Sequence, residues 1–297
     1  MRTVFILAAS MIALGASAFA AAATSKPFDQ EVAAEARGVV EISNTSGSVD
    51  VRGWDRAEVS VHGQIGEGVE RVELKSEPGR TFIKVVLPGH SARDGEAKLQ
   101  IHIPKDSELH LTTVSADANV SGVQGIQRVN VVSGDVSTEI AGSDLDLKTV
   151  SGDVKIKGHG QSARLHVSTV SGDVHLEHGA GDLEISSVSG SLVVTLDSVR
   201  SLHARTTAGD LRFEGKLTRG ASFDAATVSG DLNVRASAEG GFAYEVSTFS
   251  GDINDCFDAK RDKGGIVGHS ISGSRGEGAG QMRLKTMSGD VELCDRN

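Results

Sequence analysis

A Ser-Gly-Asp motif recurs along this sequence and places a carboxylate at the same position in most of its copies. Rows of aspartates can bind Ca²⁺, as in glycine-rich nonapeptide repeats, where two turns supply the oxygen ligands of each ion. The alternative is a structural turn, in which glycine adopts an unusual φ and the Ser and Asp side chains accept hydrogen bonds from nearby backbone N–H groups. One aspartate per about 19 residues leaves a cation with few protein ligands, so we predict the turn. The repeated aspartates are Asp117, Asp135, Asp153, Asp173, Asp210, Asp231, Asp252 and Asp290.

A second column, five places before each motif serine, alternates acids with imidazoles over its first four members. It contains Asp146, His166, Glu184, His203, Asp224 and Glu245. His166, Glu184 and His203 could share a metal ion, but neighbouring strands lie ~4.8 Å apart, so the outer pair would span ~9.6 Å. A solvated ladder of opposite charges explains the same residues. We therefore predict no metal site, no cofactor and no catalytic residue, and keep these three as the metal-ligand candidates.

These columns require elements that repeat with the same period. The motif serine, or its equivalent, falls at Ser115, Ser133, Ser151, Ser171, Ser189, Ala208, Ser229, Ser250 and Ser288, with an earlier copy at Ser46. Apolar and polar residues alternate between the motifs, which indicates strands with one buried face. Each unit is too short to bury that face alone and must stack on its neighbours. The fold is therefore all-β, and is either a parallel β-helix with one coil per repeat or an antiparallel meander.

The column six places after each serine favours the parallel β-helix. Along the sequence it runs Glu139, Lys157, Glu177, Thr195, Glu214, Arg235, Cys256 and Cys294. Stacked coils would place these residues side by side, where acids alternate with bases or neutral residues. Like charges on adjacent strands would be unfavourable, so the alternation is what stacking requires.

The ends of the chain differ from the repeat. Residues 1–22 have the charged start, apolar stretch and small-residue cleavage site of a secretory signal peptide. Residues 23–105 are strand-like but lack the period, and we expect an N-terminal β cap that covers the end of the solenoid. Residues 106–297 form the repeat β-helix, with a glycine-rich insertion at about 260–280 that we expect to be a loop or protruding hairpin.

The two cysteines occupy equivalent positions of their repeats, although the last interval is twice the period. If their coils are adjacent, their Cα atoms lie ~5 Å apart, which suits a disulfide, whereas two steps would give ~10 Å. We predict adjacent coils, a Cys256–Cys294 disulfide and an excursion between them. Such a bond is compatible with an oxidising compartment outside the cytoplasm.

Charge, hydropathy and motif content argue against several classes of function. The formal charge of −10 argues against a nucleic-acid partner, and no second apolar run is long enough to span a membrane. The sequence contains no nucleophile elbow, phosphate-binding loop or zinc-helix signature, and the repeat between Ser115 and Asp252 is not interrupted. We therefore predict that the protein is not an enzyme.

The repeat unit Leu145–Ile156 and the opening unit Ser46–Asp55 resemble the bacterial β-strand-repeat family labelled putative adhesin, over about residues 38–295. The resemblance implies a right-handed parallel β-helix in an exported or envelope protein, and offers no catalytic residues. Our leading hypothesis is an exported, non-enzymatic adhesin or envelope scaffold, periplasmic or extracellular, whose partner is an envelope protein or a glycan. The alternatives are a polysaccharide-processing β-helix enzyme, with its site near the insertion or along one face, and a metal- or solute-binding module centred on His166, Glu184 and His203.

Overall fold

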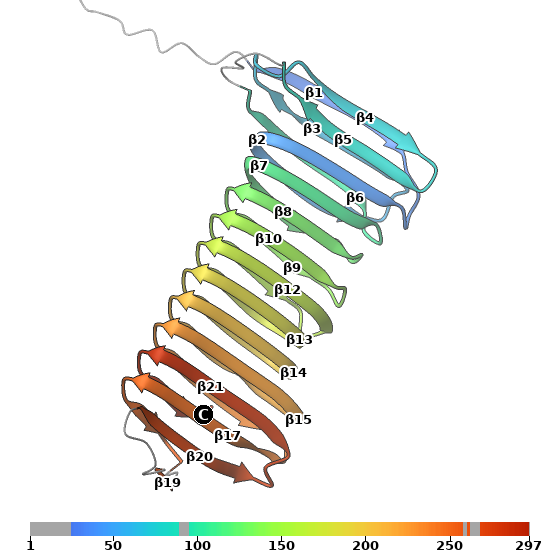
Figure 1. Cartoon of the computed structure of the whole chain (residues 1–297). Helices are drawn as coiled ribbons and strands as arrows, with labels where there is room; N and C mark the ends of the chain where they lie inside the picture. Colours follow the sequence, from blue (N-terminus) through green and yellow to red (C-terminus); the bar gives the residue numbers. More distant parts are fainter. Residues whose placement is uncertain (1–24, 89–94, 258–259, 262–267, 297) are drawn as a thin grey trace, which may run out of the picture.

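The computed structural model describes residues 25–88, 95–257, 260–261 and 268–296. Every regular element in these ranges is a β-strand, and the strands stack into an elongated column (Figure 1). The all-β prediction is therefore confirmed. The predicted signal peptide lies outside the described residues.

The strands of the N-terminal half are β1 Lys26–Ala33, β2 Val39–Trp54, β3 Glu58–Ile65, β4 Arg71–Glu77, β5 Arg80–Val86, β6 Ala97–Pro104, β7 Glu108–Ser121, β8 Gln127–Ser133, β9 Val136–Ile140, β10 Leu145–Ser151 and β11 Val154–Gly158. Those of the C-terminal half are β12 Ser162–Ser171, β13 Val174–Ser189, β14 Leu192–Ala208, β15 Leu211–Ser229, β16 Leu232–Ala238, β17 Gly241–Ser250, β18 Ile253–Asp255, β19 Lys260–Arg261, β20 His269–Gly276, β21 Gly280–Ser288 and β22 Val291–Cys294.

Successive repeats pair in parallel and in register. Strand β10 lies between β8 and β12, so that Ser151 pairs with both Ser133 and Ser171. After the Ser-Gly-Asp corner, β11 lies in the same way between β9 and β13. Side chains alternate between the two faces of each strand, so every second residue points into the interior of the stack. Leu147 and Val167 are two such residues, and both are fully buried. The stack is thus solenoid-like, with one coil per repeat.

The residues six places after the motif serines lie side by side on neighbouring strands, as the sequence predicts, up to Arg235. Lys157 pairs with both Glu139 and Glu177, and Glu214 pairs with Arg235. Opposite charges therefore meet across neighbouring strands, where each pair stabilises the sheet by a few tenths of a kcal/mol.

The N-terminal region combines a true coil with antiparallel strands. The early motif copy in β2 stacks directly on β7, with Ser46 paired to Ser115 although the two are far apart in sequence. Strands β3–β6 form the excursion between them, and β1–β3, β3–β6 and β4–β5 pair antiparallel. β2 also pairs in parallel with β5 and β6, which joins the antiparallel strands to the stack.

The last coil is not at the end of the stack, which corrects the order implied by the sequence. β21 lies between β15 and β17, and β22 lies between β16 and β18. Arg235 therefore pairs with Cys294, and not with Cys256 as chain order would give. Cys256 and Cys294 occupy adjacent coils, with their Cα atoms 5.0 Å apart, and form a disulfide.

The glycine-rich insertion contributes a strand to the end of the stack. β20 pairs antiparallel with β17 along its full length, from Gly241 opposite Gly276 to Thr248 opposite His269. Within the segment, β19 pairs antiparallel with β20, as the two strands of a hairpin do. β20 also lies along the open edge of β17, where it satisfies a row of backbone hydrogen-bonding groups. Residues 258–259 and 262–267 of the segment lie outside the described residues.

Candidate functional site

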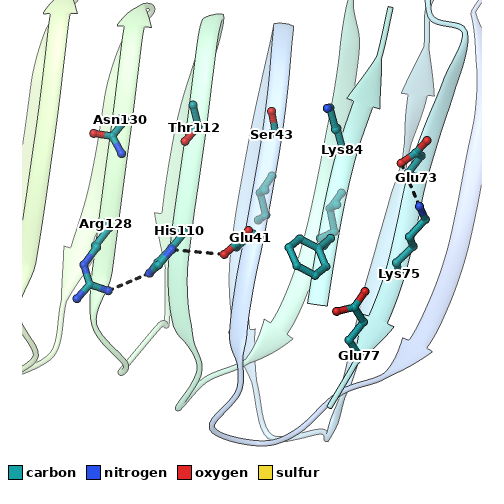
Figure 2. A pocket seen from close by; sticks show the side chains of 13 residues that line it. Glu41, Ser43, Glu73, Lys75, Glu77, Lys84, His110, Thr112, Arg128 and Asn130 are labelled. Atoms are coloured by element: carbon teal, nitrogen blue, oxygen red, sulfur yellow. Dashed lines mark hydrogen bonds and ion pairs between the residues drawn. The ribbon is translucent and has the colours of Figure 1, made fainter. Parts of the chain in front are cut away.

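A groove crosses the outer face of five adjacent strands where the N-terminal strands join the stack. It has a volume of about 630 Å³ and is open to solvent along its length. Strands β4, β5, β2, β7 and β8 supply its lining in that order (Figure 2). The lining residues are Glu41, Ile42, Ser43, Glu73, Lys75, Glu77, Phe82, Ile83, Lys84, His110, Thr112, Arg128 and Asn130.

Register places the polar side chains in two rows across these strands, because residues of the same parity face the same side. One row runs Lys75, Phe82, Glu41, His110 and Arg128. The next row runs Glu73, Lys84, Ser43, Thr112 and Asn130. The first row is dominated by charge, and the second ends in uncharged hydrogen-bonding groups. A ligand lying across the strands would meet both.

His110 lies close to three charged side chains. Its Nε2 lies 2.6 Å from Glu108 and 2.9 Å from Nη1 of Arg128, and Arg128 is itself ion-paired with Glu108. Its Nδ1 lies 3.8 Å from Glu41. When Nε2 carries a proton it donates to Glu108, and when it does not it accepts from Arg128. The imidazole ring can therefore form a hydrogen bond with either Glu108 or Arg128 without moving.

Glu41 and Glu73, two of the acids that line the groove, form ion pairs with cations. Arg80 forms an ion pair with Glu41 at 3.1 Å, and its guanidinium lies 5.4 Å from the centre of the Phe82 ring. The hydrogen bond from Arg71, with the charge of Lys75, lowers the pKa of Glu73. Glu73 therefore stays ionised and acts as an acceptor. The chemistry that these residues offer is recognition of a polar ligand by hydrogen bonds and charges of both signs, beside one aromatic ring.

The metal-ligand candidates do not form a metal centre. Nδ1 of His166 lies 3.4 Å from Glu184, and Glu184 pairs in register with His203 on its other side. Across the part of the chain that the structure describes, no three His, Cys, Asp or Glu residues are close enough to hold an ion. His166, Glu184 and His203 thus lie side by side on three adjacent strands.

The repeated aspartates accept hydrogen bonds from backbone N–H groups of the neighbouring coil. Oδ1 of Asp135 accepts from the backbone N–H of Asp153 at 2.9 Å, and Asp153 accepts in turn from Asp173 at 3.0 Å. The same bond links Asp117 to Asp135, Asp173 to Ser191, Asp210 to Asp231, Asp231 to Asp290 and Asp290 to Asp252. Seven of the eight carboxylates are thus inter-coil acceptors, and hydrogen bonding to the charged form offsets the repulsion between stacked carboxylates.

Sequence reasoning missed a Ser-His-Asp chain in the N-terminal strands. Oγ of Ser60 lies 2.6 Å from Nε2 of His62, and Nδ1 of His62 lies 2.8 Å from Asp29. Ser60 is fully buried, so a substrate cannot reach its hydroxyl as a nucleophile requires. The Ser60–His62–Asp29 contacts instead link β1 to β3. Ser60 and His62 stand two places apart on one strand, which is a weak signal, and Asp29 joins them only through strand pairing.

Comparison with protein families decides the identity of the fold. A family model described as Toastrack DUF4097 matches residues 30–193 and 70–294. The chain belongs to the Toastrack DUF4097 family. The two matches overlap and together span nearly all of the described residues, in agreement with a stack of similar coils. The family assignment supports the resemblance to adhesin-like bacterial β-repeat proteins and names no reaction.

Solved structures similar to this Toastrack DUF4097 chain share little sequence with it. They include a putative lipid binding protein from Parabacteroides distasonis (12% identity, TM-score 0.42, 91% of this chain and 97% of that one). A putative adhesin from Bacteroides fragilis has 13% identity and a TM-score of 0.40, covering 91% and 98%. A putative cell adhesion protein from Clostridium sporogenes has 8% identity and a TM-score of 0.29, covering 92% and 100%. No curated protein gives a significant match.

Proposed function

We propose that the protein is exported and non-enzymatic, and that it acts as an adhesin or envelope scaffold through its outer surface. The observation that carries this proposal is the groove over β4, β5, β2, β7 and β8. It is an open face of a rigid sheet, and its charged groups are already ordered by ion pairs such as Arg80–Glu41 and Arg128–Glu108. A preordered polar face loses little entropy on binding, as a docking surface requires.

Export is supported by the signal-like residues 1–22 and by the disulfide, since disulfides persist in oxidising compartments. No helix long and apolar enough to cross a membrane occurs among the described residues. We place the protein in the periplasm or outside the cell, with an envelope protein or a glycan as its partner. N-terminal sequencing of the protein recovered outside the cytoplasm tests this, and recovery with residues 1–22 intact would contradict it.

We also propose right-handed winding of the coils, with residues 23–105 as a cap on the solenoid of residues 106–297. The right-handed twist of β-strands favours right-handed crossovers between parallel strands. The antiparallel strands β1, β3, β4 and β5 support a capping role, because they cover the edge of the first parallel coil.

The test of function measures saturable binding of residues 23–297 to washed envelope particles of the producing bacterium by co-sedimentation. A groove variant, Lys84→Glu with Arg128→Glu, is expected to bind at least about tenfold more weakly. The matched control, Arg212→Glu with Lys216→Glu, makes the same charge change in a distant coil and should bind normally. Absence of saturable binding by the unmodified protein would overturn the proposal. Release of reducing sugar ends from the particles would favour the polysaccharide-processing alternative.

A further inference from the structure

A row of exposed apolar side chains runs along one edge of the stack, immediately before the motif serines. We call this row the apolar ridge. Each member is between 44% and 60% exposed. In stack order the apolar ridge contains Val114, Val132, Val150, Val170, Val188, Val228, Met287 and Phe249. Thr207 occupies the one polar position, between Val188 and Val228.

Register makes the apolar ridge continuous. Val150 stands between Thr149 and Ser151, which pair with Thr169 and Ser171 on either side of Val170. Neighbouring ridge residues are therefore one coil apart, at ~4.8 Å, and the whole ridge extends for ~38 Å. In Figure 1 it follows the edge where the arrowheads of β8, β10 and β12 lie. Contiguous exposed apolar surface of this kind marks an interaction site on a folded protein, whereas single exposed residues do not.

The flanks of the apolar ridge differ in charge. On one side, across the Ser-Gly corner, lie the eight exposed repeat aspartates. In seven of them Oδ1 accepts the hydrogen bond from the neighbouring coil, and the other carboxylate oxygen does not take part in that bond. On the other side, two places before the ridge, the outward residues are mostly uncharged, and the charged ones are Lys148, Arg205 and Lys285. A line of carboxylates beside a line of apolar groups is complementary to apolar side chains flanked by cations.

We propose that the apolar ridge and the aspartate row together form a docking site for a basic amphipathic segment of a partner protein. This deepens, and rests on, the proposed function as an adhesin or scaffold. The apolar side chains of the segment cover the valines, and its lysines or arginines pair with the free carboxylate oxygens. A second copy of this chain does not fit, because it would bring a second acidic row and a second net charge of −10 to the same edge. An anionic membrane surface is repelled for the same reason.

The probe is a fluorescein-labelled 14-residue peptide of Leu and Lys with an amphipathic helical pattern, measured by fluorescence anisotropy against residues 23–297. Two reference peptides separate the contributions: Ser in place of every Lys, and Gly in place of every Leu. We expect the Leu/Lys peptide to bind at least about tenfold more tightly than either. Its affinity should fall with increasing salt, because the charge contribution is exposed.

Two triple variants locate the site. Val150→Thr, Val170→Thr and Val188→Thr keep the β-branched shape and remove the apolar surface. Asp135→Asn, Asp153→Asn and Asp173→Asn keep the oxygen that accepts the inter-coil bond and remove the charge. Each should weaken binding by about tenfold or more. Ile126→Ser, at a 38% exposed position outside the ridge, is the matched control and should bind as the parent does.

The outcomes separate this inference from the proposed function. Equal peptide affinity for the parent and both triple variants, with unchanged thermal unfolding, would overturn the docking site. So would a concentration-dependent dimer in sedimentation velocity that the valine variant abolishes, because the ridge would then be a self-interface. Envelope binding by the parent, measured on the same preparations, is a separate readout. Its absence would overturn the proposed function even if the peptide bound.

Discussion

Oδ1 of Asp153 accepts a hydrogen bond from the backbone N–H of Asp173, one coil further along the stack, at 3.0 Å. The side chain of one repeat thus satisfies the main chain of the next, at the corner where the two parallel sheets meet. The series of such bonds stops at Ser191, whose backbone N–H donates to Asp173 but whose side chain has no carboxylate to continue it.

Replacing Asp153 by alanine removes this acceptor and leaves the N–H of Asp173 to water. We expect Asp153→Ala to lower the free energy of unfolding by about 1 kcal/mol. Asp153→Asn is the matched control, because its amide oxygen can accept the same bond. Urea unfolding followed by circular dichroism measures both. An equal loss in the two variants would show that charge, and not the inter-coil bond, is what matters.

The glycine after each motif serine permits the close approach of the coils. Gly152 has φ +122°, and a Cβ there would lie 2.1 Å from the carbonyl oxygen of Gly134. Gly220 also has positive φ, +75°, but a Cβ there would meet nothing within 4 Å. We expect Gly220→Ala to cost about 1 kcal/mol of strain and Gly152→Ala about 3 kcal/mol or more. Similar midpoints of thermal unfolding for the two variants would contradict the steric account.

The disulfide ties the inserted coil to the coil at the end of the stack. Reduction of Cys256–Cys294, which closes a sequence separation of 38 residues, is expected to cost about 4 kcal/mol. Because coils in a stack interact mainly with their neighbours, the loss should concentrate at the C-terminal end. Hydrogen exchange should rise in β17, β20, β21 and β22 and remain slow in β10 to β13. The double variant Cys256→Ser with Cys294→Ser should behave like the reduced protein, and uniform acceleration along the chain would refute this.

Arg283 of the inserted coil lies between two acids. Its guanidinium is 3.8 Å from Asp224 on one side and 3.5 Å from Glu245 on the other. Arg283→Glu would place three carboxylates in adjacent strands, and we expect a loss of about 1 kcal/mol. Arg212→Glu is the control for a charge reversal on another exposed strand position. The difference between the two in urea unfolding should shrink in high salt, since exposed charges are screened; a salt-independent difference would argue against an electrostatic cause.

Tyr244 is the single tyrosine of the chain, so its titration can be followed directly by ultraviolet absorbance. Burial, together with the hydrogen bond to Asp255 at 3.0 Å, raises its pKa to about 12. The raised pKa means that this stabilisation is fully present below pH ~10 and is lost as the pH rises through ~12. Asp255→Asn should lower the pKa of Tyr244 by removing the carboxylate. A midpoint at pH ~10 in the folded parent protein would contradict the burial of the phenol.

The candidate groove could be predicted only in part. Two of its strands can be predicted from the alternation of apolar and polar residues in Val40–Ser43 and Leu109–Thr112. Nothing in those patterns says that β2 pairs with both β5 and β7, because β-strand partners are set by long-range register. The rows that bring Phe82, Glu41 and His110 together therefore appear only in the folded chain.

Sequence alone determined the repeat, the all-β class and the positions of the corners, since period-two alternation and a glycine at each corner are local properties of the chain. It also indicated that the two cysteine coils are neighbours, since equivalent positions one coil apart suit a disulfide. The order of the last coils was decided only by tertiary structure. Every coil presents equivalent positions to its neighbours, so the repeat pattern by itself does not fix the order in which coils stack. In the observed order of coils, Arg283 lies between Asp224 and Glu245. If the coils stacked in the order of the sequence, these two acids would be neighbours.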